Sequence, residues 1–241
     1  MNISEQLRSG LGYSICDVDD INVLERLRDL FADVVDISMT SKRKNINELR
    51  KSLLGMSLAE INRIRVSLLK HNNISDMVIE SCADLVEKLC GRDLFIQRRA
   101  NVIFNIPGRE GLRIWGHYEI TSGISPFTYG IWAPFHDLED DGGVYFLDQK
   151  LSMEIMQKEE AIGQVNGTSV LNMKEKPNPV RLKFGQVIVF SPFVLHGNVF
   201  FNSELSRIGC SVRFQSCRSP LLQKNSDYLK YYRLNQIHSK K

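Results

Sequence analysis

The feature that most constrains the fold is a change of sequence pattern near residue 93. Before this point, apolar residues recur at spacings of three and four, the period of an amphipathic α-helix. After it come short runs rich in β-branched and aromatic residues, separated by proline, glycine and aspartate, as is typical of strands and turns. The chain is therefore expected to be α+β, with a helical part first and an antiparallel β part second.

The first part predicts four amphipathic helices whose apolar stripes belong to the core. Asp19 and Asp20 are suitable N-caps for the first helix, and Gly91 is a suitable end for the last. The stripes cover about 21–35, 46–54, 58–69 and 77–89.

The second part predicts many short strands with turns between them. The expected strands are 94–98, 101–106, 113–119, 127–134, 143–148, 180–183, 186–190, 196–201 and 206–215. This pattern indicates an antiparallel sandwich or barrel, of which the double-stranded β-helix, the cupin-like jelly roll, is the version that encloses a pocket and the one we expect. Residues 151–178 are less regular and are expected to form a loop or lid, and the segment from Tyr228 to Ile237 is expected to form a helix. We expect a single domain made of a helical part (1–91), a jelly-roll core (92–219) and a C-terminal helix and tail (220–241).

Composition limits the classes of function. The formal charge of +3 is spread thinly, with short basic clusters only at 42–44 and 240–241, which argues against nucleic-acid binding. The five cysteines form no CxxC pair, which argues against a disulfide framework and a zinc knuckle and fits a cytoplasmic protein. No apolar run is long enough for a transmembrane helix, and a secretory signal pattern is missing. We therefore expect a small-molecule partner and no membrane or nucleic-acid partner; the oligomeric state is not indicated.

Three residues of the β part suggest a metal site. In the predicted strand 113–119, His117 and Glu119 are two apart and therefore share a face, and His196 at the end of an apolar run offers a second imidazole. Two histidines and one carboxylate leave three positions of an octahedral metal open, as in non-haem iron enzymes, whereas zinc prefers a tetrahedral set. The spacing alone is weak evidence, because most strand histidines are core or surface residues.

Arg207 is a candidate anion-binding residue in the same cavity as these proposed ligands. It begins the strand that follows His196, and a hairpin between them would return its guanidinium to the same cavity. A buried arginine needs an anion, and its planar fork suits a carboxylate. The alternative is a surface ion pair with Glu204.

These residues resemble the Fe(II)/2-oxoglutarate-dependent oxygenases, and within them the phytanoyl-CoA dioxygenase-like branch that includes the ectoine hydroxylases. The resemblance covers roughly 97–215. His117-Tyr118-Glu119 looks like the HxD/E element, His196 like the distal histidine, and Asn202-Ser203 followed by Arg207 like the N-S-x-x-x-R segment. It implies that His117, Glu119 and His196 hold Fe(II), that Arg207 binds the far carboxylate of 2-oxoglutarate, and that dioxygen is consumed.

Further positions of the resemblance concern the co-substrate and the substrate. Gln97 and Asn101 are similar to a Q-x-x-x-N element, and Trp132 and Asn198 stand at positions that line the co-substrate. Asn198 replaces a small hydroxyl residue, and Glu119 replaces the commoner aspartate, so its longer side chain must bend to reach the metal. The candidates for substrate contacts at the pocket mouth are Tyr118, His136, Tyr145 and Arg213.

The segment 132–147 also looks like a smaller group of such oxygenases found among genes for surface carbohydrates. It implies hydroxylation of a sugar or sugar derivative in surface-carbohydrate or secondary-metabolite biosynthesis. Two alternatives remain open: a catalytically inactive jelly-roll module that binds a carbohydrate or anion, and a cupin-type isomerase with zinc or manganese. The second alternative gives Arg207 no role.

Overall fold

The computed structural model describes residues 3–37, 46–71, 73–139, 143–198, 202–220 and 231–237. The α-helices are α1 (Ile3–Ser9), α2 (Ile21–Ile37), α3 (Ile46–Ser52), α4 (Leu58–Leu69), α5 (Ile74–Ser81), α6 (Ala83–Cys90) and α7 (Gln149–Ala161). Short 3-10 helices are η1 (Leu53–Gly55), η2 (Glu110–Leu112), η3 (Glu119–Ser122) and η5 (Thr168–Asn172). The strands are β1 (Tyr13–Asp17), β2 (Asp93–Gln97), β3 (Asn101–Asn105), β4 (Tyr129–Pro134), β5 (Tyr145–Phe146), β6 (Gln186–Phe190), β7 (His196–Gly197), β8 (Arg207–Ser216) and β9 (Tyr232–Gln236).

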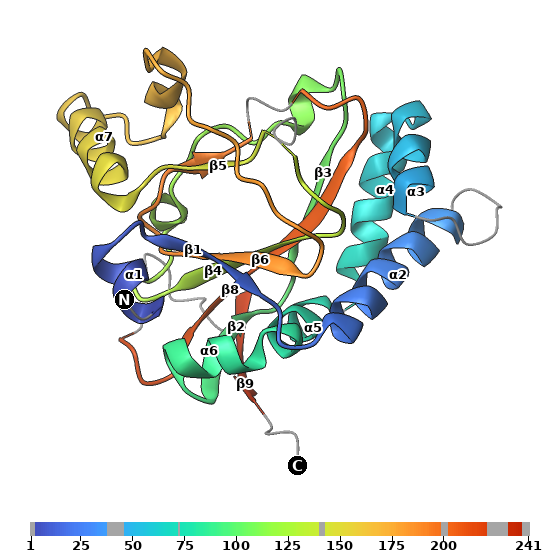
Figure 1. Ribbon diagram of the computed structural model, residues 1–241, viewed down its shortest axis with the longest axis horizontal. Helices are drawn as coiled ribbons and strands as arrows, with labels where there is room; N and C mark the ends of the chain where they lie inside the picture. Colours follow the sequence, from blue (N-terminus) through green and yellow to red (C-terminus); the bar gives the residue numbers. More distant parts are fainter. Residues whose placement is uncertain are drawn as a thin grey trace.

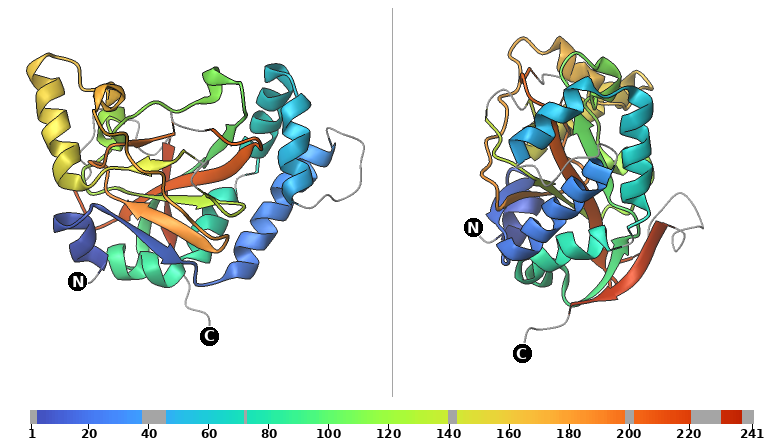
Figure 2. Two further views of the ribbon diagram at one scale, coloured as in Figure 1. Left: turned by 45° about the horizontal axis from the view of Figure 1, so that its top comes forward. Right: turned by 90° about the vertical axis from the view of Figure 1, so that its right-hand side faces the viewer.

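The strands form two antiparallel sheets. The larger has seven strands in the order β1-β6-β4-β8-β2-β9, with β3 paired to the first half of β8, and the smaller consists of β5 and β7. A pocket lies between them, lined by residues of both sheets. Helices α2, α3 and α4 lie at one end of this arrangement and α7 at the other (Figures 1 and 2). The fold is therefore a mixed helical and antiparallel β structure, consistent with the expected jelly roll.

Strand β8 shows why the pocket forms on one face of the larger sheet. Its even-numbered residues from Ile208 to Phe214 are apolar and belong to the hydrophobic cluster shared with the N-terminal helices. Three of its odd-numbered residues, Arg207, Ser211 and Arg213, line the pocket on the other face. Because side chains alternate across a strand, the same ten residues anchor the helical layer and supply polar groups to the pocket.

The N-terminal helices cover the outer face of the larger sheet. Apolar residues of α2, α4, α5 and α6 form one buried cluster with residues of β2, β3, β4, β6 and β8. Asp19 does not cap α2 as expected; its carboxylate accepts hydrogen bonds from the backbone N–H groups of Asp84 and Leu85 at the start of α6. The helices and the larger sheet therefore share one hydrophobic core. None of the helices in the described ranges is long and apolar enough to cross a membrane.

The expected strand 113–119 is wrong. Only His117 pairs with another strand residue, through an isolated bridge to His196, and Glu119 already begins η3. The reason is that β7 is only two residues long, so the segment has no partner along most of its length. Tyr118, between the two ligands, nevertheless has an extended backbone, and His117 and Glu119 both line the pocket while Tyr118 packs away from it.

The expected C-terminal helix is also wrong for the residues described. Tyr232–Gln236 form β9, which pairs antiparallel with Asp93–Gln97 of β2. The backbone groups at this edge of β2 need partners, and β9 supplies them from far along the chain. The remainder of the predicted helix and tail lies outside the described residues, as do the two basic clusters.

The segment 151–178 is more regular than expected. It contains most of α7 and all of η5, and Asp148 caps α7 by accepting a hydrogen bond from the N–H of Leu151. Sequence periodicity misses this helix because its buried face contains Ser152 and Glu159 beside Ile155. Segment 180–183 forms only a bridge between Leu182 and Leu138.

The hairpin expected between His196 and Arg207 does not form. His196 pairs with Phe146 in the smaller sheet, and Arg207 pairs with Asn105 in the larger one. Residues 199–201 of the expected strand 196–201 lie outside the described residues. The remaining differences are local: α1 and β1 were not predicted, and the expected helix 77–89 is divided at Cys82 into α5 and α6.

Candidate metal centre

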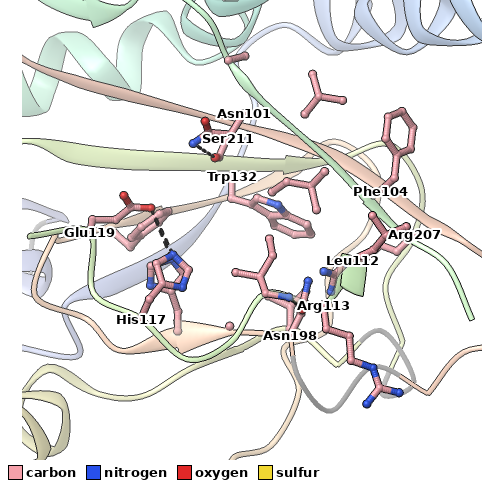
Figure 3. A pocket seen from close by; sticks show the side chains of 18 of the residues that line it. Asn101, Phe104, Leu112, Arg113, His117, Glu119, Trp132, Asn198, Arg207 and Ser211 are labelled. Atoms are coloured by element: carbon pink, nitrogen blue, oxygen red, sulfur yellow. Dashed lines mark hydrogen bonds and ion pairs between the residues drawn. The ribbon is translucent and has the colours of Figure 1, made fainter. Parts of the chain in front are cut away.

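Three side chains converge at one wall of the pocket. The Nε2 atoms of His117 and His196 lie 3.8 and 3.7 Å from the same oxygen, Oε1 of Glu119. Single ligand atoms of the three residues all lie within 4.8 Å of one another. The longer side chain of Glu119 therefore reaches the point that the two imidazoles face; Figure 3 shows its contact with His117.

The histidines are held in the tautomer that a metal requires. Nδ1 of His117 lies 2.9 Å from the carbonyl oxygen of Trp115, and Nδ1 of His196 lies 2.9 Å from that of Val194. A carbonyl can only accept, so both Nδ1 atoms carry hydrogen and the Nε2 lone pairs face Glu119 in the neutral rings. The ring of His196 also stacks on Phe146 at 5.0 Å, which fixes its orientation. Two imidazoles and one carboxylate arranged in this way fit a divalent metal such as Fe(II).

Arg213 compensates the charge of Glu119. The carboxylate is 5% exposed, and its second oxygen, Oε2, forms an ion pair with Nη2 of Arg213. Burial would raise the pKa of Glu119, but the adjacent imidazoles and the charge of Arg213 hold it well below its usual range. Tyr232 of β9 lies beside Arg213; burial raises the pKa of this phenol and the guanidinium opposes the rise. The C-terminal strand thus reaches the carboxylate ligand through Arg213.

The two imidazoles differ electrostatically although they face the same oxygen. Burial lowers the pKa of His117, but the neighbouring carboxylate of Glu119 outweighs it, so the pKa is raised. For His196, burial and the nearby His117 lower the pKa. As the pH falls, His196 therefore stays neutral, and able to bind a metal, to a lower pH than His117 does.

Arg207 lies on the far side of Trp132 from His117 and Glu119 (Figure 3). It is 2% exposed, and burial lowers its pKa to about 9. Its guanidinium carbon lies 5.7 Å from the centre of the Trp132 ring, and its Nη2 donates a hydrogen bond to Oδ1 of Asn105. A buried cation facing a pocket is a suitable site for a carboxylate, because an anion offsets the cost of burying the charge.

Asn105 was not predicted, yet it joins several parts of the site. Its Oδ1 accepts hydrogen bonds from Arg207 and from Nδ2 of Asn198, the latter at 2.8 Å, and its Nδ2 donates to the carbonyl of Leu112. Asn198 also accepts a hydrogen bond from the N–H of Ile114. Strand alternation would have shown Asn105 on the same face as Asn101, which is the signal that could have identified it.

Gln97 and Asn101 occupy different positions in the pocket wall. Asn101 lines the pocket and donates a hydrogen bond to Ser211 Oγ, which was not predicted, at 3.3 Å. Gln97 does not line it; it donates to Asn101 Oδ1 at 3.2 Å and accepts from the N–H of Arg213 at 3.1 Å. Gln97 thus holds two residues of the pocket lining, Asn101 and Arg213, in place from outside the pocket.

Three expected substrate contacts lie in packing rather than in the pocket lining. Tyr118 is fully buried, and its hydroxyl donates to the carbonyl of Ser152 at 3.3 Å. The Tyr145 hydroxyl lies so close to Gly116 that a Cβ there would be 2.7 Å from it. His136 is buried, and its Nε2 accepts from the N–H of Ile208, next to Arg207. Arg213, the fourth expected contact, does line the pocket but is paired with Glu119.

Comparison with known proteins defines the fold class. No protein-family model matches the sequence, and no curated protein matches it significantly. The apo structure of ThoJ, a non-haem monooxygenase, covers 93% of this chain and 85% of its own at 16% identity, with a TM-score of 0.56. SnoK, a non-haem α-ketoglutarate-dependent carbocyclase from nogalamycin biosynthesis, covers 98% of this chain and 96% of its own at 11% identity, with a TM-score of 0.54.

At these identities the likeness shows the fold alone. The chain shares the fold of ThoJ and SnoK, and within this fold it has a His-Glu-His group that could hold a metal.

Proposed function

We propose that this chain is an oxygenase that depends on non-haem Fe(II) and 2-oxoglutarate and belongs to the phytanoyl-CoA dioxygenase-like branch. The observation that carries the proposal is the convergence of His117, Glu119 and His196 on one point, with both Nε2 lone pairs directed inward. The shared fold of ThoJ and SnoK supports the same class. The proposed reaction is hydroxylation of a sugar or sugar derivative in surface-carbohydrate or secondary-metabolite biosynthesis.

The residues of the pocket would have separate roles in binding the metal, binding the co-substrate and excluding water. Fe(II), once bound, would supply the activation of dioxygen, with oxidative decarboxylation of 2-oxoglutarate as its source of electrons. His117, Glu119 and His196 would hold the metal. Arg207 holds the far carboxylate of the co-substrate across Trp132, and the buried rings of Phe146 and Phe190 keep water from the ligands.

The first test is replacement of a ligand and of a histidine outside the pocket lining. His196→Ala should abolish Fe(II)-dependent formation of succinate from 2-oxoglutarate and the visible absorption band that Fe(II) and 2-oxoglutarate give without oxygen. His71→Ala is the matched control, because His71 is exposed beyond the end of α4 and should change neither signal. Unchanged succinate formation in His196→Ala would refute the proposal. A wild-type protein with neither signal would instead be an inactive binding module.

The second test concerns the co-substrate. Arg207→Ala should weaken 2-oxoglutarate binding by about tenfold to a hundredfold, since a hydrogen bond to a charged group contributes about 1.5–3 kcal/mol. The metal affinity without 2-oxoglutarate should change little, because Arg207 lies across the pocket from the ligands. Equal 2-oxoglutarate affinity of the variant and the wild type, measured by titration calorimetry with Ni(II) in place of iron, would exclude this role.

A further inference from the structure

A buried serine of α7 completes the strand pairing that holds His196. In the smaller sheet Phe146 pairs with His196, so Leu147 and Leu195 would form the next pair. The N–H of Leu147 does donate to the carbonyl of Leu195, at 2.9 Å. In place of the reverse bond, the Ser152 hydroxyl accepts from the N–H of Leu195 at 2.9 Å and donates to the carbonyl of Leu147 at 3.4 Å. The hydroxyl is therefore inserted into the ladder directly before His196.

The backbone of the same serine holds the segment of the other two proposed ligands. The carbonyl of Ser152 accepts a hydrogen bond from the hydroxyl of Tyr118 at 3.3 Å. Tyr118 is the residue between His117 and Glu119, and its ring is buried in a cluster that includes apolar residues of α7. The backbones of His117 and His196 exchange two hydrogen bonds, at 3.0 and 3.1 Å. Ser152 thus contacts both chain segments that supply the proposed ligands.

The second polar residue on the buried face of α7 fixes the turn after this helix to the same region. The buried carboxylate of Glu159 accepts hydrogen bonds from the N–H groups of Asn166, Gly167 and Ser169, at 3.0, 2.8 and 3.2 Å. Gly167 lies so close to Gly116 that a Cβ on Gly167 would be 2.6 Å from the carbonyl oxygen of Gly116, directly before the first proposed ligand. Helix α7 is therefore attached near both of its ends to the segments that carry the ligands.

We propose that Ser152 is a positioning residue of the metal centre, which fixes where the three proposed ligands meet although it does not line the pocket. This inference rests on the proposed function, because the position of the ligands matters only if they hold a metal. Ligands that are already in place need no rearrangement when a metal binds, so their support contributes to metal affinity. An apolar residue at position 152 would leave the buried N–H of Leu195 without this acceptor. The role explains why a serine interrupts the apolar face of α7.

The test is Ser152→Ala, with Ser81→Ala as the matched control. Ser81 is also a fully buried helical serine, and its hydroxyl donates to the carbonyl of Val78 at 2.8 Å, but it lies on α5 and outside the pocket lining. Both variants should unfold at lower urea concentrations than the wild type. Only Ser152→Ala should bind Ni(II) more weakly, by about tenfold, the lower end of the effect of removing groups that support metal ligands. Calorimetry on the folded whole protein measures this affinity, and the visible absorption of bound Co(II) should change in Ser152→Ala alone, since it reports the ligand geometry.

A second variant removes the other contact of Ser152. Tyr118→Phe keeps the buried ring and deletes the hydroxyl that donates to the Ser152 carbonyl. It should weaken Ni(II) binding in the same direction and by a smaller factor, because this hydrogen bond is longer than the one from Leu195. If Ser152→Ala does not fold, Tyr118→Phe decides alone.

The outcomes separate this inference from the proposed function. Wild-type protein that binds neither Ni(II) nor Co(II) counts against the metal centre itself. If the wild type binds Ni(II) and the variants at Ser152 and Tyr118 bind it equally well with an unchanged Co(II) spectrum, the serine has a structural role alone and the inference is overturned. An equal loss of Ni(II) affinity in Ser81→Ala would also overturn it, because the effect would then follow from reduced stability.

Discussion

Replacement of Arg213 by glutamine should destabilise the metal-free protein and enlarge the stabilisation that a divalent metal provides. Without metal, Arg213 is the cation in direct contact with the buried carboxylate of Glu119. With metal, the other oxygen of Glu119 faces a second and larger positive charge at the two imidazoles. Arg213 and the metal therefore compete to compensate the same carboxylate.

The size of the effect follows from burial. Removing one partner of a buried ion pair costs about 3–5 kcal/mol. The Arg213 side chain is 20% exposed, so we expect about 3 kcal/mol for the metal-free protein. With metal bound, the metal also compensates the charge of Glu119. The same substitution should then cost about 1 kcal/mol, the upper end of the range for a screened ion pair. The difference of about 2 kcal/mol corresponds to roughly thirtyfold tighter metal binding by the variant.

The assay is urea-induced unfolding with and without Ni(II), in the absence of 2-oxoglutarate. Arg218→Gln is the matched control, because Arg218 is exposed just after β8 and should leave both curves unchanged. Adding Glu119→Gln to Arg213→Gln should restore part of the metal-free stability, since the uncompensated charge is then removed. Unaltered metal-free stability of Arg213→Gln, or a stabilisation by Ni(II) no larger than that of the wild type, would refute the reasoning.

Two other predictions concern residues that support the site. Burial and the charge of Arg50 lower the pKa of His136 to about 4, below its unfolded value near 6.5. The resulting stability is present above pH 6.5 and lost as the pH falls toward 4. His136→Gln should reduce this acid-side loss by about 3 kcal/mol in unfolding curves, and an unchanged loss would contradict it. Gly116→Ala should cost about 1–3 kcal/mol, because its Cβ would lie 2.5 Å from the carbonyl oxygen of Gly167. Gly55→Ala, with open space around it, is the control, and equal thermal stability of both variants would contradict the prediction.

The sequence was sufficient for the secondary structure wherever apolar periodicity is strong. Helix α4, with its capping box of Ser57 and Glu60, and strands β6 and β8 lie where the pattern predicts them. These elements form because their apolar residues repeat with the period of the element, which is a local property. The same alternation explains why Arg213 and Arg207 face one pocket.

The grouping of His117, Glu119 and His196 was predicted for a partly incorrect reason. The segment 113–119 is not a strand, but Tyr118 has an extended backbone, so His117 and Glu119 still face the same side. One bridge between His117 and His196 joins the segment to the smaller sheet, and η3 begins at Glu119. Residue type and spacing indicated a metal site, whereas the tertiary contacts decide its geometry.

The sequence by itself thus determined the elements whose apolar periodicity is strong, the residues able to bind a metal and the presence of arginines near them. Only the tertiary structure decided how the arginines are used, since Arg213 pairs with Glu119 whereas Arg65 reaches the pocket from a separate helix. It also decided that the C-terminal residues 232–236 form a strand against β2. The physical reason is that ion pairs and strand pairing join residues far apart in the chain, and no local pattern records which partners meet.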